Sequence, residues 1–123
     1  MNSKKSNANY NPVMQTGHDH FPGVGAVMTV AVARITLRLH DNQSLKEKRR
    51  IIKSMIERSR NRFNVSVAEV ADQDLHQRAT LGVAVVGSDQ RILNSLLDRI
   101  ITYMDSLHLA DLIDQQIELI PLG

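Results

Sequence analysis

Apolar and polar positions follow no period before Met28 and a clear period after it. Residues 1–27 are rich in Asn, Ser, Gly and His. A segment of this composition buries too little apolar surface to offset the entropy lost on ordering. We therefore expect residues 1–27 to be a flexible N-terminal extension and residues 28–123 to be a single domain. The abrupt change at a methionine also fits translation from Met28, with the extension as a gene-model artefact.

Alternation at period two, and apolar spacing at period 3.6, then divide the chain into elements. Strands are predicted over residues 30–39, 64–70, 81–86 and 112–120, the last of them ended by Pro121. A first helix is predicted to begin after Ser44, which stands three residues before Glu47 as in a capping box, and to reach Phe63. A second helix is predicted after Gly87 with Ser88 as its cap. Its apolar stripe is Ile92, Leu93, Leu96, Leu97, Ile100, Ile101, Tyr103 and Met104.

The element order βαββαβ constrains the topology. With right-handed crossovers it predicts a four-stranded antiparallel sheet with both helices on one face, a ferredoxin-like α+β sandwich. This fold supports many unrelated activities, so the function has to be sought in individual residues.

The composition excludes several kinds of chemistry. The 123 residues include no cysteine, which excludes disulfides, thiolate catalysis and cysteine-bound metals. No apolar run approaches the ~18 residues needed to span a bilayer. Residues 1–17 have no apolar segment of the kind that a secretory signal needs. We therefore expect a cytoplasmic protein with no membrane contact, and no motif assigns a cofactor.

The first predicted helix is strongly basic. Eight cations lie between Ser44 and Phe63, against only Glu47 and Glu57: Lys46, Lys48, Arg49, Arg50, Lys53, Arg58, Arg60 and Arg62. At about 100° per residue, five of them share an arc of roughly 100° opposite much of the apolar stripe. These five are Lys46, Arg49, Arg50, Lys53 and Arg60.

This placement of charge is locally unfavourable. Lys46 with Arg50, and Arg49 with Lys53, are like-charged pairs four residues apart. Cations in the first two turns also oppose the helix dipole. The alternative is that these cations only keep the helix surface solvated. Two unfavourable charge placements in the same helix favour a binding function for them instead. The candidate anion- or nucleic-acid-binding residues are Lys46, Lys48, Arg49, Arg50, Lys53 and Arg60.

Three loops are expected at one end of the fold. They carry His40, His76 and His108, with Asp41, Asp72, Asp74 and Asp111. These residues could build a metal site, or the site of an enzyme acting on a phosphorylated small molecule. Pairing of the aspartates with nearby helix cations is the favoured interpretation. No spacing singles out catalytic residues, and no glycine-rich loop follows a strand to hold a phosphate.

The sheet face away from the helices is the other candidate surface. It is predicted to show Val30, Val32, Arg34, Thr36, Arg38, Thr80, Ala84, Val86 and Gln116. It lacks aromatic side chains on which bases could stack, which disfavours RNA recognition by the strands. Small apolar groups make this open face a candidate homodimer interface, although chance exposure explains it equally well.

Two stretches resemble the YlxP-like family of bacterial domains of unknown function. They are Ser44-Leu45-Lys46-Glu47-Lys48-Arg49 and Arg62-Phe63-Asn64-Val65-Ser66-Val67-Ala68-Glu69. The resemblance starts at Met28 and implies a ferredoxin-like fold. It also implies a small bacterial protein whose gene often lies near genes for translation and ribosome maturation. It implies no activity and no catalytic residue, and this chain has His76 where family members commonly have Trp.

We therefore expect a non-enzymatic module that binds RNA or ribosomal phosphates through its basic helix. Protein interaction or homodimerisation through the open sheet face is the alternative.

Overall fold

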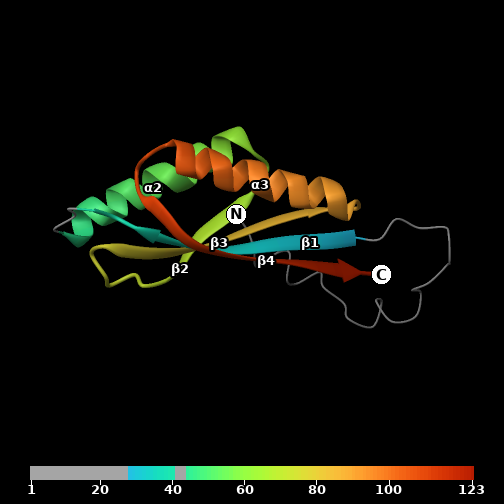
Figure 1. The fold of residues 1–123 in the computed structure, drawn as a ribbon, viewed down its shortest axis with the longest axis horizontal. Helices are drawn as coiled ribbons and strands as arrows, with labels where there is room; N and C mark the ends of the chain where they lie inside the picture. The colour runs from blue at the N-terminus through green and yellow to red at the C-terminus, as the bar shows by residue number, and fades with distance from the viewer. Residues whose placement is uncertain (1–27, 41–43) are drawn as a thin grey trace, which may run out of the picture.

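A computed structural model describes residues 28–40 and 44–123, so the N-terminal extension and Asp41 lie outside it. The described chain forms four strands and two helices in the order βαββαβ (Figure 1). The elements are β1 (Met28–Arg38), α2 (Leu45–Arg62), β2 (Ser66–Ala71), β3 (Arg78–Gly87), α3 (Gln90–Ser106) and β4 (Asp111–Leu122).

The strands form one antiparallel sheet in the order β2-β3-β1-β4, which leaves β2 and β4 as its edges. Both helices cover the same face of the sheet (Figure 1). The predicted α+β ferredoxin-like fold is confirmed. The N-terminal end of α2 and the β2–β3 hairpin lie at the same end of the molecule, where β1 also finishes (Figure 1).

The core lies between the sheet and the two helices. Alternate residues of β1 face it, and Ile35, Leu37 and Leu39 have an exposed fraction of at most 1%. Met55 of α2, with Leu97 and Ile100 of α3, meets them from the helical side at 0%. The core is aliphatic apart from methionine, as the scarcity of aromatic residues predicts.

The helix caps agree with the sequence pattern in α2 and differ in α3. Ser44 caps α2, and its Oγ accepts a hydrogen bond from the Glu47 backbone N–H at 3.1 Å. Asp89, and not the predicted Ser88, caps α3, because its carboxylate accepts from the N–H groups of Arg91 and Ile92. A carboxylate satisfies two free donors there and complements the positive end of the helix dipole.

Ile92, predicted in the apolar stripe of α3, and Ile113 of β4 are both solvent-exposed. Ile92 is 65% exposed because it lies about 100° around α3 from the buried Leu93, at the border of the apolar stripe. Ile113 of β4 is 41% exposed, at a register shift that interrupts the pairing of β1 with β4. A bulge of this kind breaks the alternation of the strand.

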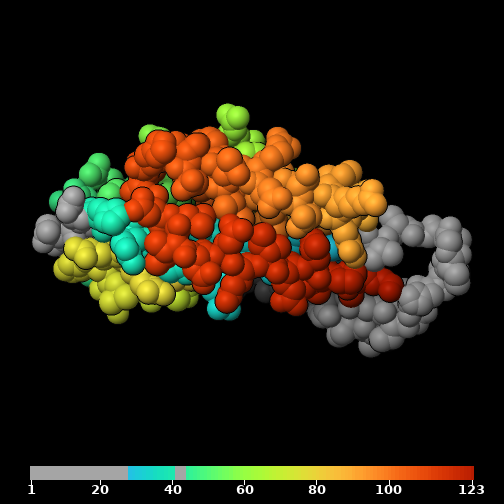
Figure 2. All heavy atoms as spheres, in the orientation of Figure 1, coloured from blue at the N-terminus to red at the C-terminus, as the bar shows by residue number. Residues whose placement is uncertain are grey.

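Strand β4 continues past the predicted stop at Pro121 and ends at Leu122, with Pro121 opposite Thr29. A proline is tolerated there because β4 is an edge strand with neighbours on one side only. In Figure 2, β4 runs along the surface beneath α3.

Lys48 connects α2 to the β2–β3 hairpin from inside the protein. Its side chain is 1% exposed, and Nζ donates to the carbonyl oxygens of Asp72 at 2.5 Å and Leu75 at 2.7 Å. A Glu69 carboxylate oxygen lies 3.2 Å from the same nitrogen. The ammonium therefore has three oxygen neighbours, which offset the cost of burying its charge.

We expect Lys48→Met to lower the free energy of unfolding by about 3 kcal/mol, because it leaves a buried carboxylate oxygen of Glu69 and two partly buried carbonyl oxygens without their donor. Urea denaturation followed by circular dichroism measures the loss. The exposed Lys46→Met is the matched control and should change stability by less than about 0.5 kcal/mol. Equal losses in the two variants would contradict this assignment.

Candidate nucleic-acid interface

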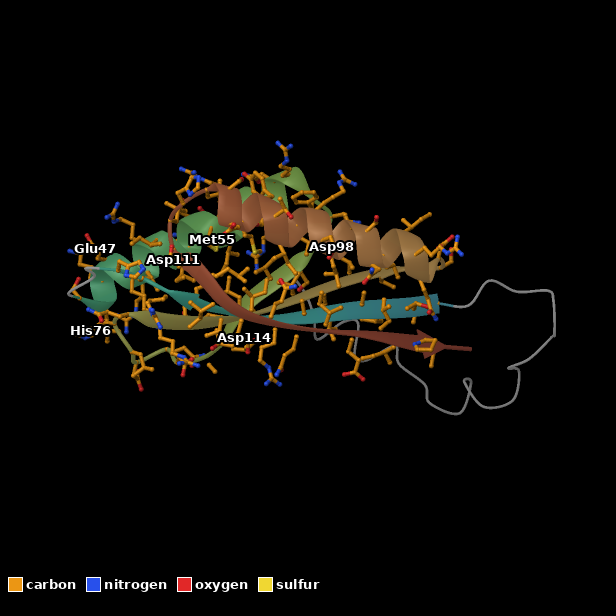
Figure 3. The ribbon with its side chains drawn as sticks, in the orientation of Figure 1. Glu47, Met55, His76, Asp98, Asp111 and Asp114 are labelled. Carbon is orange, nitrogen blue, oxygen red and sulfur yellow. The ribbon has the colours of Figure 1, made fainter. Side chains whose placement is uncertain are left out.

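Helix α2 presents most of its cations to solvent on the side away from the core. All five residues of the predicted arc are exposed: Lys46, Arg49, Arg50, Lys53 and Arg60. Nitrogen-tipped side chains project outward from the helical layer in Figure 3. We call these five residues the basic arc.

The charge of the basic arc is only partly compensated. Arg50 lies 3.7 Å from a Glu47 carboxylate oxygen, and both side chains are well exposed, so the pair contributes little. Among the described residues, Lys46, Arg49 and Lys53 have no ion-pair partner. Three cations of one helix face are thus available to an external anion.

Arg60 has a second contact. Its Nη2 donates to the Val67 carbonyl oxygen of β2 at 2.9 Å. Because β2 is an edge strand, this bond occupies a carbonyl that a further strand could otherwise use. Addition of a peptide strand along this stretch of β2 is therefore disfavoured.

A shallow groove of about 320 Å³ separates α2 from β2. Three cations of the basic arc line it together with two carboxylates and an apolar floor: Arg49, Lys53 and Arg60, Glu57 and Glu69, Ile52 and Ile56 among others. The cations lie toward the solvent side of the helix, so an extended anion could follow the groove without entering the core.

Lys48 has to be removed from the predicted anion-binding set. Its ammonium is buried and faces Asp72, Leu75 and Glu69, as described above. The helical period contains the signal for this position, since Lys48 precedes the buried Ile52 by four residues and Met55 by seven.

The loops at the hairpin end do not form a metal site among the described residues, where no group of three or more His, Asp or Glu side chains comes together. His40 Nε2 contacts the Asp111 carboxylate, and both side chains are exposed. The Asp72 carboxylate does not form the expected ion pair with a helix cation among the described residues. Asp72 instead accepts bonds from Thr80 and Arg78 of β3.

The open face of the sheet is narrower than predicted. Thr36 and Thr80 are 7% and 5% exposed, so both are buried, and Thr80 Oγ1 donates to Asp72 Oδ2 at 2.6 Å. The middle of the face forms a shallow hollow of about 400 Å³. Its lining includes Val32, Arg34, Ala68, Val70, Gly82, Ala84 and Glu118.

A cluster of arginine and aromatic side chains was not predicted from the sequence. Phe63, which follows α2, and Tyr103 of α3 form an edge-to-face ring pair, and Arg62 and Arg99 approach the rings. One signal was available, because these are the only aromatic residues after Met28. Their proximity depends on how the two helices pack.

Residues 30–117 match the family described as "Protein of unknown function (DUF503)". This chain belongs to that family. The Bacillus subtilis (strain 168) protein "Uncharacterized protein YlxP" is 40% identical over 68 residues, which cover 55% of this chain and 74% of that protein. These two matches confirm the predicted YlxP-like relationship.

Among solved structures, the chain is similar to "De novo designed protein Foldit4" with a TM-score of 0.43 and 18% identity. The similarity covers 78% of this chain and 97% of the designed protein. No helix in the described part of the chain is long and apolar enough to cross a membrane.

In this DUF503 domain the hairpin contains an aspartate in an unusual backbone conformation. Asp72 has φ 64°, in the left-handed region that Asp tolerates better than most residues. Its carboxylate accepts from Thr80 Oγ1 at 2.6 Å and Arg78 Nε at 3.2 Å. The Thr80 hydrogen bond, with the charges of Arg78 and Lys48, lowers the pKa of Asp72 despite the opposing effect of burial.

We expect the stability of the domain to fall in acid partly through Asp72. A carboxylate whose pKa is lower in the folded state stabilises that state above its unfolded pKa of about 4, and this contribution is lost as the pH falls through the folded pKa. Asp72→Asn should therefore be less stable than the wild type at neutral pH, with a difference that shrinks in acid. Urea denaturation across the acid range measures it.

The exposed Asp74→Asn in the same hairpin is the control, and it should follow the wild type throughout. An Asp72→Asn difference that stays constant with pH would show that the carboxylate charge is not what stabilises the hairpin.

Proposed function

We propose that this domain is a non-enzymatic cytoplasmic module that binds the phosphate backbone of RNA, including ribosomal RNA, through the basic arc of α2. The supporting observation is the set of five exposed cations on one side of one helix, four of them without an ion-pair partner among the described residues. Such a surface releases counterions when it meets phosphates, which favours binding regardless of base sequence.

The chemistry of the arc fits a polymer better than a small ligand. Its residues extend from Lys46 to Arg60 along α2, a span of about 21 Å at 1.5 Å per residue. A single small anion would use only a fraction of them, whereas a nucleic-acid strand presents a row of phosphates. The groove beside β2 is shallow and does not enclose a ligand, which also favours an extended partner.

Salt dependence is the first test. If all five cations of the basic arc contact phosphates of single-stranded RNA, the slope of log affinity against log salt should be about −3.5. Arg49→Glu with Lys53→Glu should remove two contacts, weaken binding strongly and bring the slope to about −2. Fluorescence anisotropy of a labelled single-stranded RNA, measured over a range of salt concentrations, gives both values.

Arg38→Glu with Arg91→Glu is the matched control. Both residues are exposed, both lie outside α2, and this pair changes the net charge by the same amount. It should keep most of the wild-type affinity and slope. Equal losses in the two double variants, or binding that is insensitive to salt, would contradict the proposal.

A second candidate function is homodimerisation through the open face of the sheet. This face carries large apolar side chains with at least 42% exposure: Met28, Val70, Val86, Ile120 and Leu122. It also carries one cation and one anion near its centre, Arg34 and Glu118, which do not pair with each other within the chain. We propose that a second copy covers it, since a two-fold axis could place Arg34 of each copy against Glu118 of the other.

A charge swap tests this dimer. We expect Arg34→Glu alone to weaken dimerisation about tenfold or more through like-charge repulsion, and Arg34→Glu with Glu118→Arg to restore it. Light scattering coupled to size exclusion over a range of protein concentrations measures the mass. A wild type that stays monomeric, or a double variant that fails to recover, would exclude the interface.

A further inference from the structure

The flank of α2 that faces α3 carries a second cationic surface with a different character. Phe63 and Tyr103 lie there with ring centroids 5.6 Å apart and planes at 73°. Both side chains are only half-buried. They are the only aromatic residues in the described part of the chain.

Arginine side chains surround these rings. The Arg62 Cζ atom lies 5.0 Å from the Tyr103 centroid and 6.0 Å from that of Phe63, and Arg99 Cζ lies 5.8 Å from the Phe63 centroid. Arg58 completes the group from the preceding turn of α2. Among the described residues, none of these three arginines has an ion-pair partner.

Two hollows meet at Arg62 and Tyr103. One, of about 380 Å³, is lined mainly by Arg62, Phe63, Asp98, Arg99, Thr102 and Tyr103. The other, of about 390 Å³, is lined by Arg58, Asn61, Arg62 and Tyr103. Each hollow is lined by two arginines and by Tyr103, but the first adds Phe63 and the Asp98 carboxylate, whereas the second has no carboxylate. Asp98 lies on α3, where Figure 3 labels it.

We infer that these hollows form a nucleotide subsite, in which a base stacks beside Tyr103 and the Arg62 guanidinium while Arg58 and Arg62 hold the adjacent phosphate. Aromatic rings and guanidinium planes are the platforms on which proteins stack unpaired bases. The Asp98 carboxylate accepts hydrogen bonds, so it favours a base with N–H donors on its edge and keeps the phosphate in the other hollow.

A purely structural role accounts less well for this arrangement. Rings that only fix α3 to the end of α2 would be better buried, and supporting arginines would pair with carboxylates. Here the rings stay half-exposed, and Asp98 is exposed in the same hollow without forming an ion pair with any described residue. Unpaired charges beside exposed π faces are what a ligand with both a base and a phosphate would use.

This inference rests on the proposed RNA binding and adds a site that contacts one base of the bound RNA. At about 100° per residue, Arg62 lies roughly 160° around α2 from Lys46, so the subsite and the basic arc are on opposite flanks of the helix. A flexible single strand could reach both by crossing the outer side of α2. The arc would hold backbone phosphates and the subsite would hold one base.

The test compares a short single-stranded RNA with an abasic phosphodiester of the same length, using the full chain and fluorescence anisotropy. Tyr103→Leu should weaken RNA binding about tenfold, the loss of one stacking contact, and leave abasic binding unchanged. Tyr103→Phe keeps the ring and should stay within about twofold of the wild type. Arg62→Gln keeps both rings but removes the guanidinium that lies over them, and it should weaken RNA binding as well.

A fall in affinity for both polymers in Tyr103→Leu, or none for either, would overturn the subsite. Melting temperatures of the variants, measured by circular dichroism, show whether a loss comes from unfolding. A folded Tyr103→Leu that still binds RNA as tightly as the wild type also overturns the inference and leaves the basic arc proposal standing.

A mononucleotide tests the nucleotide subsite even if the basic arc does not bind RNA. Quenching of 2-aminopurine riboside monophosphate on binding reports stacking without a polymer. The variant Arg49→Glu with Lys53→Glu should quench it as the wild type does, even if the basic arc does not bind RNA. Quenching that is lost in this variant, or kept in Tyr103→Leu, would overturn the subsite.

Discussion

The arrangement of this domain depends on the burial of one ammonium group. Lys48 has almost no solvent exposure, and its charge is compatible with the interior only because Asp72, Leu75 and Glu69 supply oxygens around it. These oxygens belong to β2 and the hairpin that follows it. The contact therefore fixes both the position of the first turn of α2 and the rotation of the helix about its axis.

That rotation distributes the remaining cations of α2. With Lys48 directed inward, Lys46 is left exposed to solvent, Arg49 and Lys53 lie beside β2, and Arg58 and Arg62 lie on the flank that faces α3. The helix thus carries two surfaces of different chemistry. One has cations with few partners and suits backbone phosphates, whereas the other combines arginines with both described aromatic rings.

Much of the fold could be predicted because local signals agreed with one another. Alternation located β1, and Ser44 followed by Glu47 located the start of α2, where backbone donors need an acceptor. The exposure of the basic arc also followed from the helical period. The inclusion of Lys48 was wrong because charge was weighed above position, although the period places Lys48 on the same side as Ile52 and Met55.

The sequence by itself determined the element order, the apolar faces and the basic side of α2, since these depend on periods that each segment carries within itself. The tertiary structure decided which charged side chains bind other groups of the protein and which residues of different elements come into contact. The bonds of Asp72 to Thr80 and the pairing of Phe63 with Tyr103 join residues from different elements. No local period encodes such contacts, because they depend on how separate elements pack against a shared sheet.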